Sequence, residues 1–430
     1  MPGELTTQLA AQLADLPVVD ALDLLEREGL LLPDSAVILA QHALAMAEGN
    51  APAAQRLVEL ATELQGRTGE RAEVRPWLFY VRARLALVGG DFAGAEAALE
   101  TARSLWQTLG EPVLLARSAL GLTQLLAMQG RFDDAERTVG QAAAALAAIA
   151  DRDLETELIY LDARINAATL LSYQERHAEA GAIFGDVQSA LTALLDASND
   201  DDLRAELRTR LGLLGIDLAI SHTYLDNPSA AADELAAAIT LLDQVEVRYD
   251  RGRARSNLGH LLTRTGSFAT ALGEFDAATL DMLGTGDPDG APERWDGADV
   301  LFLDHAIVQL ALNLLPEATA NLDRALALFQ RSGQRYELGQ ALYYRALVAL
   351  RDQGFDEAGE WLNQAETIFG ELANDYWLNR VRMAQALARL LAGDALAAAA
   401  RLDVLLASST ADEAGDARGQ AGLGAFPVAK

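Results

Sequence analysis

One alanine recurs along this chain at a nearly constant interval, and this repeat restricts the possible folds more than any other feature. In a clear copy, the turn Gly90-Asp91-Phe92 leads into Ala95. The nine copies of this alanine are Ala54, Ala95, Ala135, Ala180, Ala231, Ala271, Ala318, Ala358 and Ala398. They lie 41, 40, 45, 51, 40, 47, 40 and 40 residues apart, so five of the eight spacings fall within one residue of 40. A fixed period of this size predicts a solenoid, in which each unit packs on the next.

The composition indicates that the repeated unit is helical. Apolar residues make up 51% of the chain, mostly Ala and Leu, while aromatic residues make up only 6% and there are 11 prolines. Such a composition favours closely packed helices and fits no sheet class. The three longer spacings coincide with polar insertions at residues 151–153, 198–202 and 284–297. The last of these is the longest interruption, and we expect it to act as a hinge.

The most regular unit shows how its two helices would meet. Its characteristic residues are Leu258, Gly259, Leu262, Gly266, Phe268, Ala271, Phe275 and Ala278. This pattern resembles the tetratricopeptide repeat, in which small residues let two antiparallel helices approach each other. Gly259 would allow the close approach and Phe275 would fill the layer between units. Ala83, Ala168, Ala219, Ala306, Ala346 and Ala386 take the place of Gly259 in other units, whereas His42 and Thr123 depart from the pattern.

A period near 40 resembles the long-helix variety of the repeat found in kinesin light chains and in the sensor regions of bacterial signalling regulators. The resemblance implies an all-α, right-handed α-α superhelix of about nine helical hairpins over residues 33–408. Residues 1–32, with apolar residues at helical spacing, are expected to form capping helices. Residues 409–430 are rich in Gly, Ala and acidic residues and are expected to be a disordered tail.

Charge and residue usage exclude several classes of function. The chain has 63 acidic residues against 34 Lys and Arg, a net charge of -29, which argues against nucleic-acid binding. Lys430 is the sole lysine and there is no cysteine, so a Schiff-base lysine within the repeats and thiolate chemistry are excluded. The chain has no phosphate loop, no G-x-S-x-G and no H-E-x-x-H. We therefore expect no enzyme activity, no cofactor and no metal site.

The five histidines do not form a pattern typical of metal binding. His42, His222 and His305 fall on packing positions of the repeat, which predicts partly buried, hydrogen-bonded imidazoles. His177 should lie at a helix start, and His260 should face the groove. No two of them are spaced i, i+4 on one helix.

The N-terminus and the hydropathy indicate a cytoplasmic protein. Residues 1–4 contain no basic residue, and the first cation is Arg27. No apolar run reaches the roughly 18 residues that a membrane helix needs, so no membrane insertion is expected.

The resemblance also implies where a partner would bind. In such repeats the first helix of each pair lines the concave surface, with exposed positions one residue after the small contact residue and three and six residues before it. The candidate groove residues are Trp77, Tyr80, Arg84, Arg117, Gln124, Asn166, Arg253, Asn257, His260, Tyr343 and Arg380. Asn166 and Asn257 lie beside the exposed positions, and Asp162, Thr169, Ser256 and Gln340 also fall on those positions. Arg and aromatic side chains are typical of binding surfaces. Arg253, Asn257 and His260 resemble the arrangement that some repeats use to clamp a peptide carboxylate.

Two hypotheses for the function follow. In the first, the chain is a scaffold whose groove binds a peptide or a partner helix. Apolar groove stretches at Leu213, Ile216 and Ile220, and at Val300, Leu303 and Ile307, would suit an amphipathic segment, or equally a surface closed by superhelical winding. In the second, the chain is an effector-sensing module of a bacterial transcriptional or signalling regulator. The oligomeric state and the identity of the partner stay open.

Overall fold

A computed structural model describes residues 5–47, 50–69, 71–284, 298–372 and 374–402 of the chain. The expected hinge, apart from Gly284, and the expected tail at 409–430 lie outside the described residues. Within the described part the secondary structure is helical, with no strand, as the sequence predicts. No helix there is long and apolar enough to cross a membrane.

The chain divides into two compact units, residues 1–190 and residues 191–430. The helices that begin in the first unit are α1 (Thr7–Asp15), α2 (Val18–Arg27), α3 (Ser35–Met46), α4 (Ala51–Thr68), α5 (Val74–Val88), α6 (Phe92–Leu109), α7 (Pro112–Met128), α8 (Phe132–Ala147), α9 (Leu154–Tyr173) and α10 (His177–Ala197). Those of the second unit are α11 (Asp201–Tyr224), α12 (Pro228–Gln244), α13 (Arg248–Arg264), α14 (Phe268–Leu283), α15 (Asp299–Ala311), α16 (Leu315–Ser332), α17 (Arg335–Arg351), α18 (Phe355–Glu371) and α19 (Asp375–Leu391).

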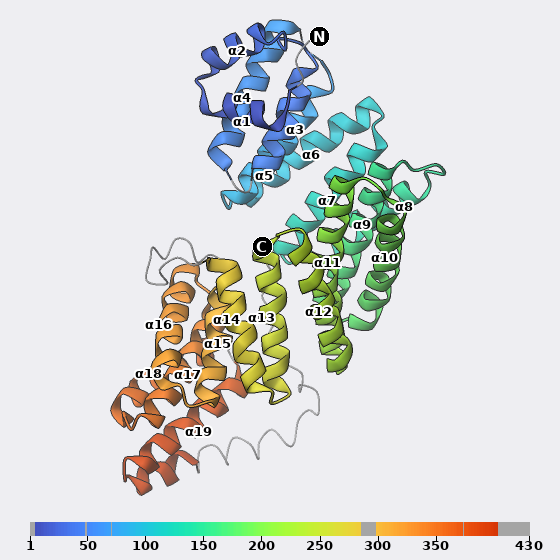
Figure 1. Ribbon diagram of the computed structural model, residues 1–430. Helices are drawn as coiled ribbons and strands as arrows, with labels where there is room; N and C mark the ends of the chain where they lie inside the picture. Colours follow the sequence, from blue (N-terminus) through green and yellow to red (C-terminus); the bar gives the residue numbers. More distant parts are fainter. Residues whose placement is uncertain (1–4, 48–49, 70, 285–297, 373, 403–430) are drawn as a thin grey trace. The chain divides into compact units, whose positions relative to one another are not determined.

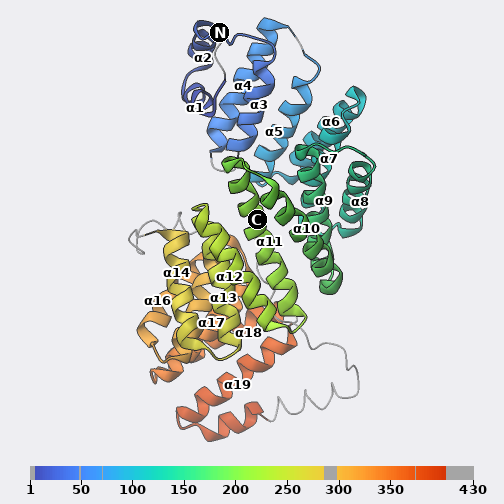
Figure 2. The same ribbon diagram turned by 45° about the vertical axis from the view of Figure 1, so that its right-hand side comes forward.

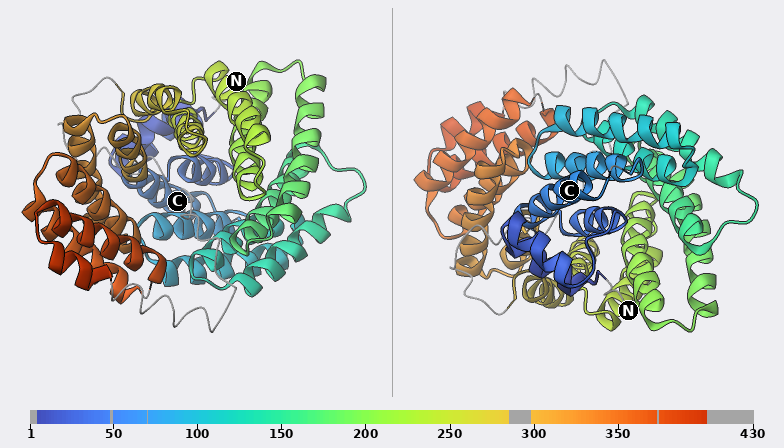
Figure 3. Two further views of the ribbon diagram at one scale, coloured as in Figure 1. Left: turned by 90° about the horizontal axis from the view of Figure 1, so that it is seen from below. Right: turned by 90° about the horizontal axis from the view of Figure 1, so that it is seen from above.

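Consecutive helices pack as hairpins in each unit. In the first unit α3 packs on α4, α5 on α6 and α7 on α8, and in the second unit α11 packs on α12, α13 on α14, α15 on α16 and α17 on α18 (Figures 1 and 2). The end-on views show the same side-by-side pairing of consecutive helices within each unit (Figure 3). Within each unit, the second helix of a hairpin also contacts the first helix of the next hairpin, as between α12 and α13. Each hairpin therefore buries its apolar faces on its neighbours along the chain, as a solenoid requires.

The repeated alanine marks the place where the two helices of a hairpin approach each other. All nine copies are buried, Ala398 with 4% of its surface exposed and the other eight with none. Most of the small residues expected in the first helix are buried as well, including Ala168 and Ala346 at 0%. Thr123, which departs from the pattern, still occupies this position, because its hydroxyl donates a hydrogen bond to the Ala119 carbonyl 2.8 Å away and so needs no other partner.

The closest approach of two helices occurs at the most regular unit. A Cβ atom placed on Gly259 would lie 2.9 Å from Cζ of Phe275, which is completely buried. This distance confirms the close approach predicted at Gly259, because a side chain larger than hydrogen at position 259 would collide with the ring.

The turn inside each hairpin uses one residue of left-handed conformation. These residues are Gly90, Gly130, Glu175, Asp226, Gly266, Asn313, Gln353 and Gly393, each five positions before a repeated alanine. In the hairpin of α17 and α18 this residue is Gln353, with φ of 65°, and not the neighbouring Gly354, which the sequence pattern suggests. Two of the polar insertions supply helix caps, since Asp153 and Asp200 accept hydrogen bonds from the first turns of α9 and α11.

Candidate binding groove of the first unit

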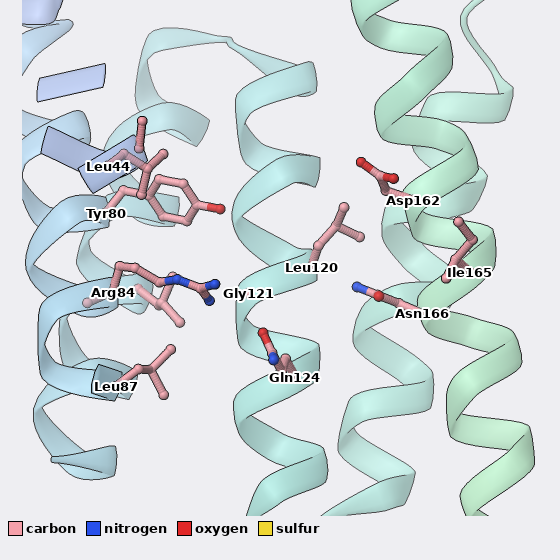
Figure 4. A pocket seen from close by; sticks show the side chains of 13 residues that line it. Leu44, Tyr80, Arg84, Leu87, Leu120, Gly121, Gln124, Asp162, Ile165 and Asn166 are labelled. Atoms are coloured by element: carbon pink, nitrogen blue, oxygen red, sulfur yellow. The ribbon is translucent and has the colours of Figure 1, made fainter. Parts of the chain in front are cut away.

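The first helices of successive hairpins enclose a groove in the first unit. The groove has a volume of about 490 Å³ and runs across α3, α5, α7 and α9. Its lining residues are Leu44, Ala45, Tyr80, Ala83, Arg84, Leu87, Leu99, Leu120, Gly121, Gln124, Asp162, Ile165 and Asn166. The side chains of Arg84, Gln124 and Asn166 come from three different helices and project into the space between them (Figure 4). Four of the candidate groove residues, Tyr80, Arg84, Gln124 and Asn166, thus lie together.

The register of the repeat explains why these residues converge. Arg84 and Gln124 follow the small contact residues Ala83 and Thr123 by one position, and Tyr80 precedes Ala83 by three. At 3.6 residues per turn, the position one residue after the small residue and the position three before it lie about 100° and about 60° around the helix from it, on the same flank. Side chains of equivalent positions then line up along the stack.

A glycine leaves room at the floor of the groove. A Cβ atom at Gly121 would lie 3.6 Å from Leu99 Cδ2 and 3.7 Å from Tyr80 Cε2, both ordinary van der Waals distances. A small side chain would therefore be tolerated by the fold, while a large one would extend into the groove. The sequence reasoning missed this residue, although it lies two positions before Thr123, as Asn166 lies two positions before Ala168.

The groove combines desolvated polar groups with apolar walls. Burial lowers the pKa of the Arg84 guanidinium, and it raises the pKa of the Tyr80 hydroxyl, an effect that the charge of Arg117 partly opposes. Gln124 and Asn166 carry amides that both donate and accept hydrogen bonds, and Asp162 supplies acceptors. Leu44, Leu87, Leu99, Leu120 and Ile165 form the apolar part of the lining. Such a lining can satisfy both the polar backbone and the apolar side chains of a bound peptide.

Trp77 does not take part in the groove, and its expected exposure is wrong. Its indole is 5% exposed and packs edge to face on the buried Trp106, with ring centroids 5.6 Å apart. Tyr80 packs on the same Trp106 at 5.5 Å. The large ring of Trp77 is drawn into the space between α5 and α6, because burial of an aromatic side chain is favourable there. Trp77 thus supports Tyr80 from below the groove surface.

Arg117 lies outside the groove lining. Its guanidinium is 3.2 Å from a carboxylate oxygen of Glu155, an ion pair between α7 and α9. The pair is partly exposed and holds two helices that border the groove.

The cations expected to clamp a carboxylate in the second unit already face acidic side chains. Arg253 donates a hydrogen bond to Asp250, 2.8 Å away, and His260 Nδ1 lies 3.2 Å from Asp304 Oδ2. Burial raises the pKa of the nearby Asp217 to about 6, and the charge of Arg253 opposes this shift. These contacts argue against the carboxylate clamp, because the positive charges are compensated by the protein. Asp217 and Asp304 escaped the sequence reasoning, although each lies two residues before a small contact residue, as Asn257 does.

Tyr343 and Arg380 belong to an aromatic cluster in the second unit. Tyr343 is 7% exposed, so its expected exposure is also wrong, because its ring packs on Trp377 at a centroid distance of 5.4 Å. The Arg380 guanidinium lies over the rings of Tyr343, Tyr376 and Trp377, at 5.7, 5.6 and 5.2 Å from their centroids. Of the expected apolar groove positions, Ile216 and Leu303 are buried, at 1% and 3% exposure, and so serve packing.

His42, His177 and His305 lie where the register predicts. His42 Nε2 is 3.2 Å from the Leu5 carbonyl, which ties the second half of α3 to the start of the described chain. His305 is 5% exposed and contacts Gln309, and α10 begins at His177.

Comparisons with known proteins agree with this architecture. No protein-family model and no curated protein sequence matches the chain. Among solved structures, it is similar to a signal transduction ATPase with numerous domains and a tetratricopeptide repeat sensor from Pyrococcus horikoshii. The TM-score is 0.59 at 12% identity, covering 96% of this chain and 65% of that one.

Two further structures are similar over nearly their whole length. One is a Rap protein complexed with Competence and Sporulation Factor, with a TM-score of 0.53 at 14% identity over 85% of this chain and 95% of that chain. The other is the apo form of the quorum sensor NprR from B. thuringiensis, with a TM-score of 0.52 at 14% identity over 87% of this chain and 98% of that chain. At these identities the likeness concerns the fold. The chain has the fold of a tetratricopeptide-like repeat protein.

Proposed function

We propose that the groove of the first unit binds a peptide segment of a partner protein, and that the chain works as an interaction module without catalysis. The observation that carries this proposal is the convergence of Arg84, Gln124, Asp162 and Asn166 on one groove, from three helices that are far apart in sequence. Packing alone does not require this set, because an apolar lining would close the same space at a lower desolvation cost.

The chemistry of the groove favours a peptide over a small apolar ligand. Amide side chains such as Gln124 and Asn166 match the alternating donors and acceptors of an extended backbone, which a hydrocarbon ligand would leave unsatisfied. Arg84 of α5 and Asp162 of α9 add groups of opposite charge to the same lining, so the groove is polar as well as apolar. The similarity to a Rap protein complexed with Competence and Sporulation Factor supports the same class of ligand.

Selection from a random peptide library tests the proposal without knowledge of the partner. Peptides would be selected on the full chain and their affinity measured by isothermal titration calorimetry. Gly121→Phe fills the groove, and we expect it to weaken binding by at least about tenfold, or 1.4 kcal/mol. Gln124→Ala together with Asn166→Ala should weaken binding to a similar extent, because two hydrogen-bonding groups are lost.

Two controls separate binding from folding. Gly121→Ala adds only a Cβ at ordinary contact distances and should keep both fold and affinity. Gly140→Phe introduces the same ring at an exposed position of α8 with open space around it, and it should leave affinity unchanged. Selected peptides that bind Gly121→Phe as tightly as the unmodified chain would place their site elsewhere and contradict the groove assignment.

The sensor hypothesis is a second candidate, favoured by the similarity to a tetratricopeptide repeat sensor and to a quorum sensor. A sensor must change its conformation on binding, whereas an adaptor need not. Hydrogen exchange with and without a selected peptide distinguishes them. Altered exchange in helices that do not line the groove, such as α13 to α18, indicates a sensor; changes confined to α3, α5, α7 and α9 indicate an adaptor.

A further inference from the structure

The glycine on the floor of the first-unit groove differs from the other glycines in the first helices of the hairpins. The other five are Gly212, Gly215, Gly252, Gly259 and Gly339. A Cβ atom added to any of them would lie between 2.4 and 3.2 Å from the nearest side-chain atom, whereas a Cβ atom on Gly121 would come no closer than 3.6 Å to a neighbour. Since glycine within a helix is unfavourable compared with alanine, helix packing accounts for the five but not for Gly121.

The register shows what is missing at Gly121. This residue lies two positions before the small contact residue Thr123, and the equivalent positions of the other first helices all carry a side chain. These positions are held by Ala40, Val81, Asn166, Asp217, Asn257, Asp304, Tyr344 and Ala384. The Asn166 side chain projects into the groove from α9 (Figure 4). At the same position, α7 leaves a notch.

The notch at Gly121 is apolar and its rim is polar. The atoms nearest to a Cβ of Gly121 are carbons of Leu99 and Tyr80, at 3.6 to 3.9 Å. Gln124 lies one turn further along α7, on the same face as Gly121. No described residue forms a hydrogen bond with the Tyr80 hydroxyl or with the side-chain amides of Gln124 and Asn166. A ligand that fits must therefore present an apolar group flanked by hydrogen-bonding groups.

We propose that the notch at Gly121 is the side-chain subsite of the groove, and that it takes one large apolar side chain of the bound peptide, such as Leu, Met or Phe. This subsite rests on the proposed function and specifies which peptides the groove selects. An extended peptide has the required chemistry, because each of its side chains is flanked by a backbone N–H and a backbone C=O. The apolar side chain leaves water against Leu99 and the Tyr80 ring, while the backbone meets the polar rim.

Parallel selection of peptides on the full chain and on Gly121→Leu tests the subsite, with affinities from isothermal titration calorimetry. Peptides selected on the unmodified chain should share one position with a large apolar residue. Replacing that residue by alanine should weaken binding to the unmodified chain at least about tenfold, or 1.4 kcal/mol, but binding to Gly121→Leu less than about threefold. The leucine side chain fills the notch, so the peptide side chain has no subsite left to lose.

Three variants serve as controls. Gly140→Leu on α8 adds the same side chain at an exposed position with open space around it, and it should keep the tenfold effect of the alanine replacement. Gly121→Ala adds a single carbon and should keep most of that effect. Tyr80→Phe removes only a hydroxyl and keeps the ring that packs on Trp106. It should weaken the original and the alanine peptide by the same factor, because the hydroxyl is expected to bind the peptide backbone.

Thermal unfolding followed by circular dichroism checks the fold of each variant. Leucine favours a helix more than glycine does, and a Cβ at position 121 meets only ordinary contact distances, so Gly121→Leu should fold. Gly121→Met, whose side chain is more flexible, provides the same test if Gly121→Leu does not fold.

A synthetic peptide of residues 403–430 distinguishes a partner from the chain itself as the source of the side chain. These residues include Leu405, Leu406, Leu423 and Phe426. Binding of this peptide that Gly121→Leu weakens and Gly140→Leu does not would support the subsite, but it would contradict the partner protein of the proposed function.

An alanine replacement that weakens binding equally to the unmodified chain and to Gly121→Leu overturns the subsite, as do selected peptides without a common apolar position. In both cases, loss of affinity in Gln124→Ala with Asn166→Ala would still support the proposed function. If no peptide binds at the groove, the proposed function fails and the subsite fails with it.

Discussion

Single glycines allow paired helices to approach each other closely. The structure shows more of these glycines than the repeat pattern predicts. Gly259 was expected to allow close approach, and the structure agrees. Gly252 and Gly339 do the same, seven residues before a small contact residue, where a Cβ would lie 2.4 Å from Met282 Cγ and 2.7 Å from Phe369 Cζ. Each of these glycines and its small contact residue lie about two helical turns apart, so one helix can touch its partner along much of its length.

Replacing Gly259 by alanine should destabilise the second unit. The added Cβ overlaps the ring of Phe275, which costs about 1–3 kcal/mol, while the better helix propensity of alanine returns about 1 kcal/mol. Urea unfolding of Gly259→Ala should therefore show a net loss. Gly273→Ala, on the other helix of the same hairpin and in open space, should instead stabilise by about 0.5–1 kcal/mol. Equal effects of the two substitutions would contradict the close approach.

A chain of polar groups favours the neutral form of His305. Arg324 donates to Asn321 Oδ1 at 3.1 Å, Asn321 donates to Gln309 Oε1 at 3.0 Å, and Gln309 Nε2 lies 3.1 Å from His305 Nε2. Since the amide of Gln309 is oriented by Asn321, its NH₂ group faces His305 Nε2, an arrangement that favours the neutral imidazole. Burial lowers its pKa, and the charge of Asp276, 3.4 Å away, partly opposes this shift.

Stability should depend on this histidine at mildly acidic pH. The folded pKa of His305 lies below the unfolded value of about 6.5, so the unfolded chain takes up the proton first and stability falls as the pH drops below about 6.5. Asp217 acts in the opposite sense, because its pKa is raised by folding. The measurement is therefore the difference in unfolding free energy between the unmodified chain and His305→Gln, which should shrink between about pH 7.5 and 5. A difference in unfolding free energy that stays constant with pH would contradict the lowered pKa of His305 in the folded chain.

At the scale of helices, one carboxylate joins α13 to α14. Asp281 on α14 is 8% exposed at its side chain and accepts hydrogen bonds from Arg251 Nε at 2.8 Å and Arg255 Nε at 3.1 Å. Both arginines are on α13, four residues apart, so they present their guanidinium groups on one face. Arg251 also pairs with Asp243 of α12, which is 65% exposed.

Removal of the Asp281 charge should weaken this pair of helices strongly. Asp281→Asn leaves two partly buried guanidinium groups without a full counter-charge, and we expect a loss of about 3 kcal/mol in thermal or urea unfolding. Asp243→Asn removes an exposed partner of the same Arg251 and should cost at most about 1 kcal/mol. If both substitutions cost the same, burial is not what makes the Asp281 contact strong.

At the scale of the whole molecule, a stack of hairpins predicts local rather than global responses. Each hairpin contacts its neighbours along the chain, and the chain forms two compact units. Stability in such an arrangement is a sum of unit and nearest-neighbour contributions. A defect in one hairpin should therefore weaken it and the hairpins beside it, and leave distant ones unchanged.

Hydrogen exchange of Gly259→Ala measures this range. Amides of α13 and α14, and of the adjoining α12 and α15, should exchange faster, whereas those of α3 and α4 in the first unit should keep the rates of the unmodified chain. Gly273→Ala should show no such acceleration. Faster exchange of α3 and α4 by the same factor would mean that the chain unfolds as one cooperative body.

The candidate groove could be predicted only in part. Position relative to the small contact residue identified Tyr80, Arg84, Gln124 and Asp162, which line the groove, as does Asn166 beside these positions. The same rule placed Trp77 on the exposed surface. The rule considers position alone and not the preference of a large ring to pack beside Trp106. The rule also treats every unit alike, so it could not show that Arg253 and His260 face acidic residues of the second unit.

The repeat period, the helical class, the buried alanines and the close approach at Gly259 follow from the sequence by itself, because each depends on spacing and side-chain size within one hairpin or its neighbour. Only the tertiary structure decided where a cavity opens and which acidic side chains Arg253 and His260 face. These features depend on side chains from helices that are forty or more residues apart, and their balance of packing and desolvation is a property of the folded arrangement.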